Sequence, residues 1–232
     1  VSSVENSPSM YSRRVVEIPA CGGLVLSGPG RGITETFGTV IPATADSRNW
    51  RALLHAWSTS VEARVEESWL QYRSVMRSHT VDTELTIMFR IAGIAVSGPE
   101  LAEYAVVIPA SVEDIDSTAK SIVAQSHLPR TVYSYVDVEL IDTMFEDSPV
   151  DVKSAEELRI DEAKWIGIAD RPLPRTHFED LLYAERFGDW TRISARQVTD
   201  ADYGSTIARE VKQTSSTDGL IRATTLDLDG DL

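Results

Sequence analysis

The sequence predicts an α/β protein made of two units joined by a helical segment. Short apolar runs alternate with amphipathic stretches in both parts of the chain, which is the pattern of an α/β fold. The charge is also divided unevenly. Residues 1–98 hold 9 basic and 9 acidic residues, whereas residues 99–232 hold 13 and 27 and carry the whole formal net charge of −14. This difference indicates two units with different surfaces.

The first unit, at residues 1–96, is expected to be the Rossmann-like half of a larger fold, with a helical segment. Apolar positions after two serines predict a helix at 10–20. Apolar runs at 24–26 and 39–42 predict two short strands around a glycine-rich loop. From 47 to 94, apolar residues recur every three or four positions and predict three helices.

The second unit, at residues 100–232, begins after the linker Ser97-Gly98-Pro99. Its first apolar run is continuous, which is typical of a strand inside a parallel sheet. The periodicity predicts strands at 104–109, 131–136 and 164–169 and helices at 112–126 and 177–187.

Composition excludes several classes of protein. The acidic surplus argues against a nucleic-acid partner, since phosphate contacts need an excess of lysine and arginine. No stretch approaches the roughly 18 apolar residues of a transmembrane helix. The polar first 15 residues do not resemble a secretory signal. We therefore expect a cytoplasmic protein, and, because the chain begins at Val1, a segment of something longer or a processed product. Nothing in the sequence predicts an oligomeric state.

The residue types that bind metals are sparse or scattered. Cys21 is the single cysteine, so no internal disulfide can form, and its apolar surroundings predict a small buried residue. The four histidines lack the spacing of metal ligands, so no metal site is assigned to them. The tail at 226–231 alternates acids without the closing glutamate of a calcium loop, which favours a solvated acidic tail or a strand cut short.

The first candidate site suits a diphosphate and a ribose and consists of Ser9, Ser12, Arg13, Glu17, Gly22 and Gly23. A serine-rich loop that opens a helix presents free amide groups and the positive end of the helix dipole, which suit a diphosphate. Glu17, about one turn further, can accept hydrogen bonds from two ribose hydroxyls, and the paired glycines let the backbone approach a ligand. An ordinary capped helix with Glu17 facing solvent fits the same residues, and the spacing alone favours it.

The runs SRRVVEIPACGGLVLSGPGRGITETFG and RSVMRSHTVDTELTIMFRIAG lie within residues 9–92. They resemble the C-terminal half of a GT-B glycosyltransferase, of the glycosyl transferases group 1 type that includes spore-protein-like members. In such proteins this half binds the nucleotide diphosphate of the sugar donor. The resemblance implies that Glu17 holds the donor ribose, while Ser9 stands where the paired-glutamate motif has its first glutamate. The N-terminal half, which brings the acceptor site, has no counterpart in the sequence.

The second candidate site consists of Asp170 and Arg171. Residues 104–187 resemble a family 2 glycosyltransferase with the GT-A fold: a strand ending in IP, a helix, then Q and P, and later WIGIADRP followed by FEDLL. The resemblance implies a nucleotide at the end of the first strand and metal-binding carboxylates around Asp170. Only Asp170 remains of that cluster, so Mg²⁺ or Mn²⁺ is not firmly implied. Arg171 could pair with the diphosphate in place of a metal, or the unit could be structural only.

The sequence therefore predicts part of a glycosyltransferase. It would move a sugar from a nucleotide-diphosphate donor to a hydroxyl group of a glycan or another acceptor; no catalytic residue is assigned. The alternative is a non-catalytic interaction or scaffold module that keeps glycosyltransferase folds, which Ser9 and Arg171 favour as departures from the family patterns. A nucleotide-binding regulatory protein is a third, weaker interpretation.

Overall fold

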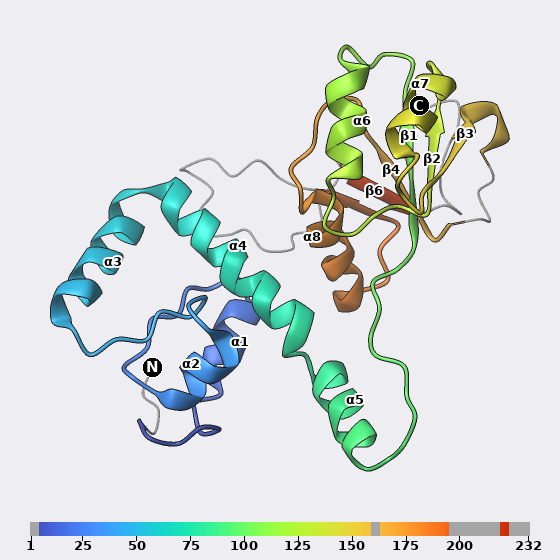
Figure 1. The fold of residues 1–232 in the computed structure, drawn as a ribbon. Coiled ribbons are helices and arrows are strands. Elements are labelled where there is room, and N and C mark those ends of the chain that lie inside the picture. Colours follow the sequence, from blue (N-terminus) through green and yellow to red (C-terminus); the bar gives the residue numbers. More distant parts are fainter. Residues whose placement is uncertain (1–4, 159–162, 195–218, 223–232) are drawn as a thin grey trace. The chain divides into compact units, whose positions relative to one another are not determined.

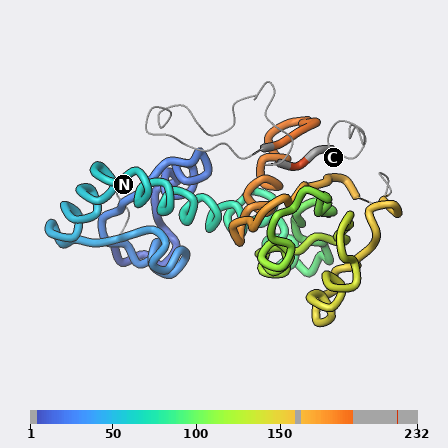
Figure 2. The backbone as a smooth tube through the Cα atoms, turned by 90° about the horizontal axis from the view of Figure 1, so that it is seen from above, coloured from blue at the N-terminus to red at the C-terminus, as the bar shows by residue number. Residues whose placement is uncertain are grey.

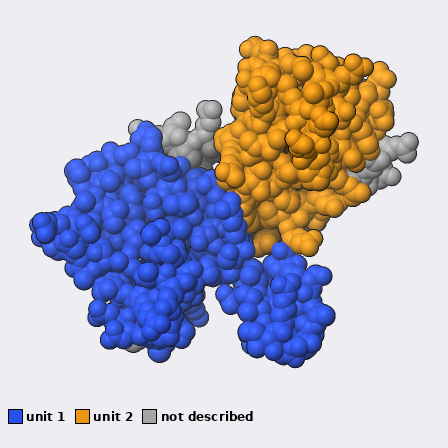
Figure 3. Space-filling view, viewed as in Figure 1, with its two compact units in different colours: residues 1–99, 199–207 blue, residues 100–198, 208–232 orange. Residues whose placement is uncertain are grey.

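The computed structural model describes residues 5–158, 163–194 and 219–222. These residues form two compact units, and the chain passes from the first to the second between Pro99 and Glu100 (Figure 3). None of the helices in the described ranges combines the length and the apolar character that a membrane crossing needs.

Unit 1 is built from helices (Figures 1 and 2). Its elements are α1 (Arg14–Ala20), α2 (Arg31–Phe37), α3 (Ser47–Thr59), α4 (Val61–Ser78) and α5 (Val81–Ile91). The three longer helices begin with side-chain caps, because Asp46, Ser60 and Thr80 each accept a hydrogen bond from an amide of the first turn. A small apolar core holds α1, α2 and α4 together: Val15, Val25, Ile33, Phe37, Ile41 and Val75.

The Rossmann-like half predicted for residues 1–96 is not confirmed. The two strands predicted at 24–26 and 39–42 are wrong. Between residues 5 and 99, the β structure is an isolated parallel bridge between Ser27 and Ala43. Unit 1 is therefore helical in its described residues.

The side chain of Gln71 explains why no sheet forms there. Gln71 is fully buried on α4. Its amide oxygen accepts from the Val25 N–H at 2.8 Å, and its amide nitrogen donates to the Val25 C=O at 3.1 Å. Buried backbone groups must be paired. Here the Gln71 side chain supplies the two hydrogen bonds that Val25 would otherwise form with a neighbouring strand. The apolar run at 24–26 is thus buried without joining a sheet.

His79 and Thr80 form the junction between α4 and α5. The His79 amide donates to the Val75 carbonyl and ends α4, while Thr80 caps α5. Beyond this junction, α5 leaves apolar side chains exposed; Val81, Met88 and Ile91 are 74%, 63% and 82% accessible. Side chains of this kind are usually buried, so α5 is an unusual surface for a folded unit.

Unit 2 is an α/β unit with a six-stranded sheet in the order β3-β2-β1-β4-β6-β5 (Figure 1). The strands β3, β2, β1 and β4 are parallel, and β6 and β5 extend the sheet in antiparallel fashion. The strands are β1 (Tyr104–Ile108), β2 (Thr131–Ser134), β3 (Asp151–Ser154), β4 (Trp165–Ile168), β5 (Arg192–Ser194) and β6 (Gly219–Arg222). The helices are α6 (Ile115–Val123), α7 (Val138–Phe145) and α8 (His177–Ala184), with 3₁₀ turns η1 (Ala155–Glu157) and η2 (Glu185–Phe187).

The predicted α/β alternation is confirmed in this unit. The three predicted strands are β1, β2 and β4, and the two predicted helices are α6 and α8, each ending a few residues earlier than expected. The sequence did not predict α7, β3, β5 or β6. Strand β3 is half exposed and lacks a continuous apolar run.

The central strand β1 is buried along its whole length. Its alternate side chains enter two apolar clusters, with Tyr104, Val106 and Ile108 in one and Ala105 and Val107 in the other. Alternation between two buried faces is what a parallel strand at the centre of a covered sheet requires.

We predict that Gly167→Ala destabilises unit 2. Gly167 lies in β4, and a Cβ atom there would sit 2.4 Å from Cε1 of the fully buried Phe178 ring. Because this ring has no room to move, overpacking should lower the free energy of unfolding by about 1–3 kcal/mol in urea denaturation. Gly98→Ala is the matched control, since its nearest side-chain atom would be 3.8 Å away. Equal stability of the two variants would contradict this packing.

Candidate functional site

The sheet of unit 2 has a topological switch point between β1 and β4. From β1 the chain turns to β2 on one side, and β4 lies on the other side of β1. In open α/β sheets, ligands bind outside the carboxyl ends of the strands where the connections diverge in this way. The Ala169 amide donates to the Val107 carbonyl at 2.9 Å, so the end of β4 is fastened beside the end of β1. Asp170 is the next residue.

Asp170 holds a buried oxygen without a partner. Its side chain is 24% exposed, and its Oδ1 atom is buried with no hydrogen-bond donor among the described residues. The neighbouring Arg171 places its Nη1 atom 4.0 Å from that oxygen, and the Arg171 side chain is 51% exposed. A buried carboxylate oxygen without a donor costs folding free energy, so Asp170 calls for an explanation other than stability.

Two further residues of this edge follow β2, and the sequence analysis missed both. The Tyr135 amide donates to the Ile108 carbonyl at 3.1 Å, which places Tyr135 beside the end of β1, and its side chain is 47% exposed. Asp137 has a φ of 30°, the single positive value among the described residues other than glycine, and its carboxylate caps α7 by accepting from the Leu140 amide. Such backbone conformations concentrate at functional sites. The parallel order of β1 and β2 was the signal that could have found them.

The loop that carries Asp170 and Arg171 is anchored at its far end. The Leu173 amide donates to the Ser121 hydroxyl at 3.0 Å, and the Gln125 amide nitrogen donates to the Pro174 carbonyl at 2.9 Å. The Ser126 amide donates to the Arg175 carbonyl at 2.8 Å. These bonds to the end of α6 fix the loop, which gives the candidate site a rigid support.

Glu179 lies in the FEDLL segment, and its carboxylate is bonded within the protein. It is 4% exposed on α8, and its carboxylate accepts hydrogen bonds from the Ser126 hydroxyl and, at 2.6 Å, from the Tyr183 hydroxyl. A buried carboxylate needs such donors. Glu179 therefore ties α8 to the end of α6 instead of facing a ligand.

The residues at this edge do not fit a divalent cation. Mg²⁺ and Mn²⁺ are held by oxygen ligands, usually including more than one carboxylate when the protein bridges them to phosphates. Asp170 is a single carboxylate with a guanidinium beside it, and no group of three or more metal-ligating side chains occurs in the described ranges. The acidic tail at 226–231 lies outside the described residues.

The first candidate site lies around α1. The carboxylate of Glu17 forms an ion pair with Arg13 at 2.7 Å, and the two side chains are 51% and 87% exposed. Ser9 is exposed. The Ser12 hydroxyl accepts only a long bond, 3.4 Å, from the Arg14 amide. Helix α1 begins at Arg14, and its N-cap residue is Arg13, which forms no side-chain cap. The predicted serine cap of this helix is therefore wrong, and Glu17 faces solvent.

Gly22 and Gly23 end α1. Gly22 has a φ of 75° and donates its amide to the Pro19 carbonyl, and the Gly23 amide donates to the Ile18 carbonyl at 2.9 Å. This is the usual way in which glycine terminates a helix. A Cβ atom on Gly23 would lie 2.6 Å from the Ile18 side chain, so close packing within the protein accounts for the glycine pair.

The prediction that Cys21 is buried is wrong. Cys21 is a free, exposed thiol. It is the C-cap residue of α1 and precedes Gly22, whose φ is 75°, so it lies at the end of the helix and not inside it.

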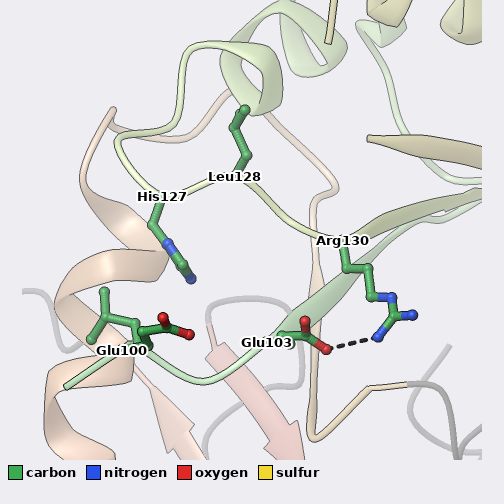
Figure 4. A pocket seen from close by; sticks show the side chains of 6 residues that line it. Glu100, Glu103, His127, Leu128 and Arg130 are labelled. Atoms are coloured by element: carbon green, nitrogen blue, oxygen red, sulfur yellow. Dashed lines mark hydrogen bonds and ion pairs between the residues drawn. The ribbon is translucent and has the colours of Figure 1, made fainter. Parts of the chain in front are cut away.

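A hollow of about 470 Å³ lies at the opposite, amino edge of the sheet (Figure 4). Glu103 and Arg130, which precede β1 and β2, form an ion pair at 2.8 Å. The Tyr104 hydroxyl donates to the His127 carbonyl at 2.6 Å, and burial raises the pKa of Tyr104 far above its ordinary value. The hollow is lined by Glu100, Leu101, Glu103, His127, Leu128 and Arg130. Its position is remote from the switch point.

Comparison with known proteins adds no relative: no family model, no curated protein and no solved structure matches the chain.

We predict that Asp170→Ala does not lower the stability of unit 2. The substitution removes a carboxylate oxygen that has no donor and an ion pair that is long and half exposed, which contributes little. The free energy of unfolding in urea should stay within about 0.5 kcal/mol of the parent value or rise. A loss of more than about 1 kcal/mol would show that Asp170 has a structural role instead.

Proposed function

We propose that this chain is part of a glycosyltransferase and that its unit 2 binds a nucleotide-diphosphate sugar at the carboxyl edge of the sheet. The observation that carries the proposal is the unpartnered carboxylate oxygen of Asp170 at the switch point between β1 and β4. The strand order and the resemblance of residues 104–187 to family 2 glycosyltransferases support it.

The groups at this edge match the parts of such a donor. The Asp170 carboxylate can accept hydrogen bonds from hydroxyl groups of the ribose or the sugar, as acidic residues do in nucleotide-binding folds. The exposed ring of Tyr135 offers a face on which a base can stack. The Arg171 guanidinium supplies charge for the phosphates.

In this reaction the main contribution of the protein is electrostatic stabilisation of the leaving diphosphate. The bond from the sugar carbon to the diphosphate oxygen breaks, and the diphosphate leaves with the electron pair. The acceptor hydroxyl oxygen forms the new bond to that carbon and releases its proton to solvent water. Because negative charge grows on the leaving diphosphate, fixed positive groups beside it lower the barrier.

The resemblance of residues 9–92 to the GT-B half supports a second location for the donor, beside Glu17. There the ribose would have to replace Arg13, which now pairs with the Glu17 carboxylate. An exposed ion pair is worth little, so such an exchange costs little. The two locations make different predictions for single substitutions.

The alternative function is a non-catalytic interaction or scaffold module that retains these folds. The exposed apolar side chains of α5 favour it, since protein interfaces bury side chains of this kind. In that case neither Glu17 nor Asp170 would contact a nucleotide.

The proposal predicts that the chain binds a nucleoside diphosphate. We expect calorimetric titration with uridine or guanosine diphosphate, and with their sugars, to show binding by one of them. Asp170→Ala should weaken that binding at least tenfold, because it removes an acceptor from the site. Glu17→Ala is the matched comparison, and it should leave the affinity within twofold.

The opposite pattern, with binding lost in Glu17→Ala and kept in Asp170→Ala, moves the donor to unit 1. If none of these nucleotides binds, with or without manganese, the interaction module is the better description.

A further inference from the structure

We infer that Arg171 does the work of a divalent cation, so that unit 2 binds the donor diphosphate without a metal. This inference rests on the proposed function, because it concerns the same site. It follows from the charges of the loops around the switch point and from the placement of Arg171 beside Asp170.

The loops that follow β1, β2 and β4 are short of positive charge. Glu113, Asp114 and Asp137 are exposed or partly exposed acids after the first two strands. The loop after β4 adds Asp170 and contains two cations, Arg171 and Arg175. A diphosphate brought to this edge would be repelled unless a positive group met it.

Of the two arginines, Arg171 is the one at the carboxyl edge. It comes two residues after Ala169, whose amide is bonded to the end of β1. Arg175 comes later in the loop, and its carbonyl is bonded to Ser126 beyond the end of α6. Because α6 runs back toward the start of β2, that end of the loop points away from the switch point.

The pair of Asp170 and Arg171 suits a diphosphate better than it suits a metal. A guanidinium beside the single carboxylate repels a second cation, since Nη1 lies 4.0 Å from Oδ1. The same guanidinium has five donors in a planar fork and can bind two phosphate oxygens at once. The Arg171 side chain is 51% exposed and so remains accessible to a ligand.

The test is calorimetric titration of the whole chain with the nucleoside diphosphate that binds it. It is run once in EDTA and once in excess Mn²⁺, with Arg171→Ala, Arg171→Lys and Arg175→Ala as variants. Arg175→Ala removes the same charge from the same loop, so it controls for the change in net charge. The urea midpoint of each variant verifies that it is folded.

The inference predicts equal affinity in EDTA and Mn²⁺, at least a tenfold loss in Arg171→Ala, and less than a twofold change in Arg175→Ala. Arg171→Lys should recover only part of the loss, because an ammonium cannot form the planar fork. Binding that needs Mn²⁺, or equal losses in the two alanine variants, would overturn the inference and leave the proposed function standing. Absence of binding in both conditions would overturn the proposed function itself.

Discussion

The parallel pairing of β1 with β4 is the constraint on which the candidate site depends. β1 is buried on both faces, and its neighbours β2 and β4 lie on opposite sides of it. That arrangement makes the connections diverge at the carboxyl ends of β1 and β4, which is where open α/β sheets bind ligands. Gly167, packed against Phe178, allows β4 to sit there, and the bonds from α6 hold the loop that follows.

The site contains a local energetic cost, the unpaired carboxylate oxygen of Asp170, which a bound ligand would remove. One carboxylate oxygen of Asp170 is buried without a hydrogen-bond donor. The Arg171 guanidinium is close enough to offset part of the negative charge but too far away to donate a hydrogen bond. Functional sites often retain such costs while the surrounding structure supplies the stability. The uneven charge of the chain fits this view: residues 99–232 carry the acidic excess, so an anion at this edge needs a positive group such as Arg171.

Sequence predicted unit 2 much better than unit 1, for a physical reason. The apolar run of β1 is long enough to need burial on both sides, and only a covered sheet supplies that. The run at 24–26 is shorter, and the buried side chain of Gln71, 46 positions from Val25, pairs with both backbone groups of Val25. No local sequence pattern reveals such a partner. Asp170 was identified through the resemblance of residues 104–187 to family 2 glycosyltransferases. Its unpartnered oxygen and the nearby Tyr135 required the strand order to be known.

The most direct test of the central claim is a crystal structure of the chain with the nucleoside diphosphate that it binds. The account predicts the nucleotide at the carboxyl ends of β1 and β4, with a hydroxyl group within hydrogen-bond distance of the Asp170 carboxylate and a phosphate on the Arg171 guanidinium. A nucleotide beside Glu17 on α1, or in the hollow next to His127 at the amino edge, would contradict it.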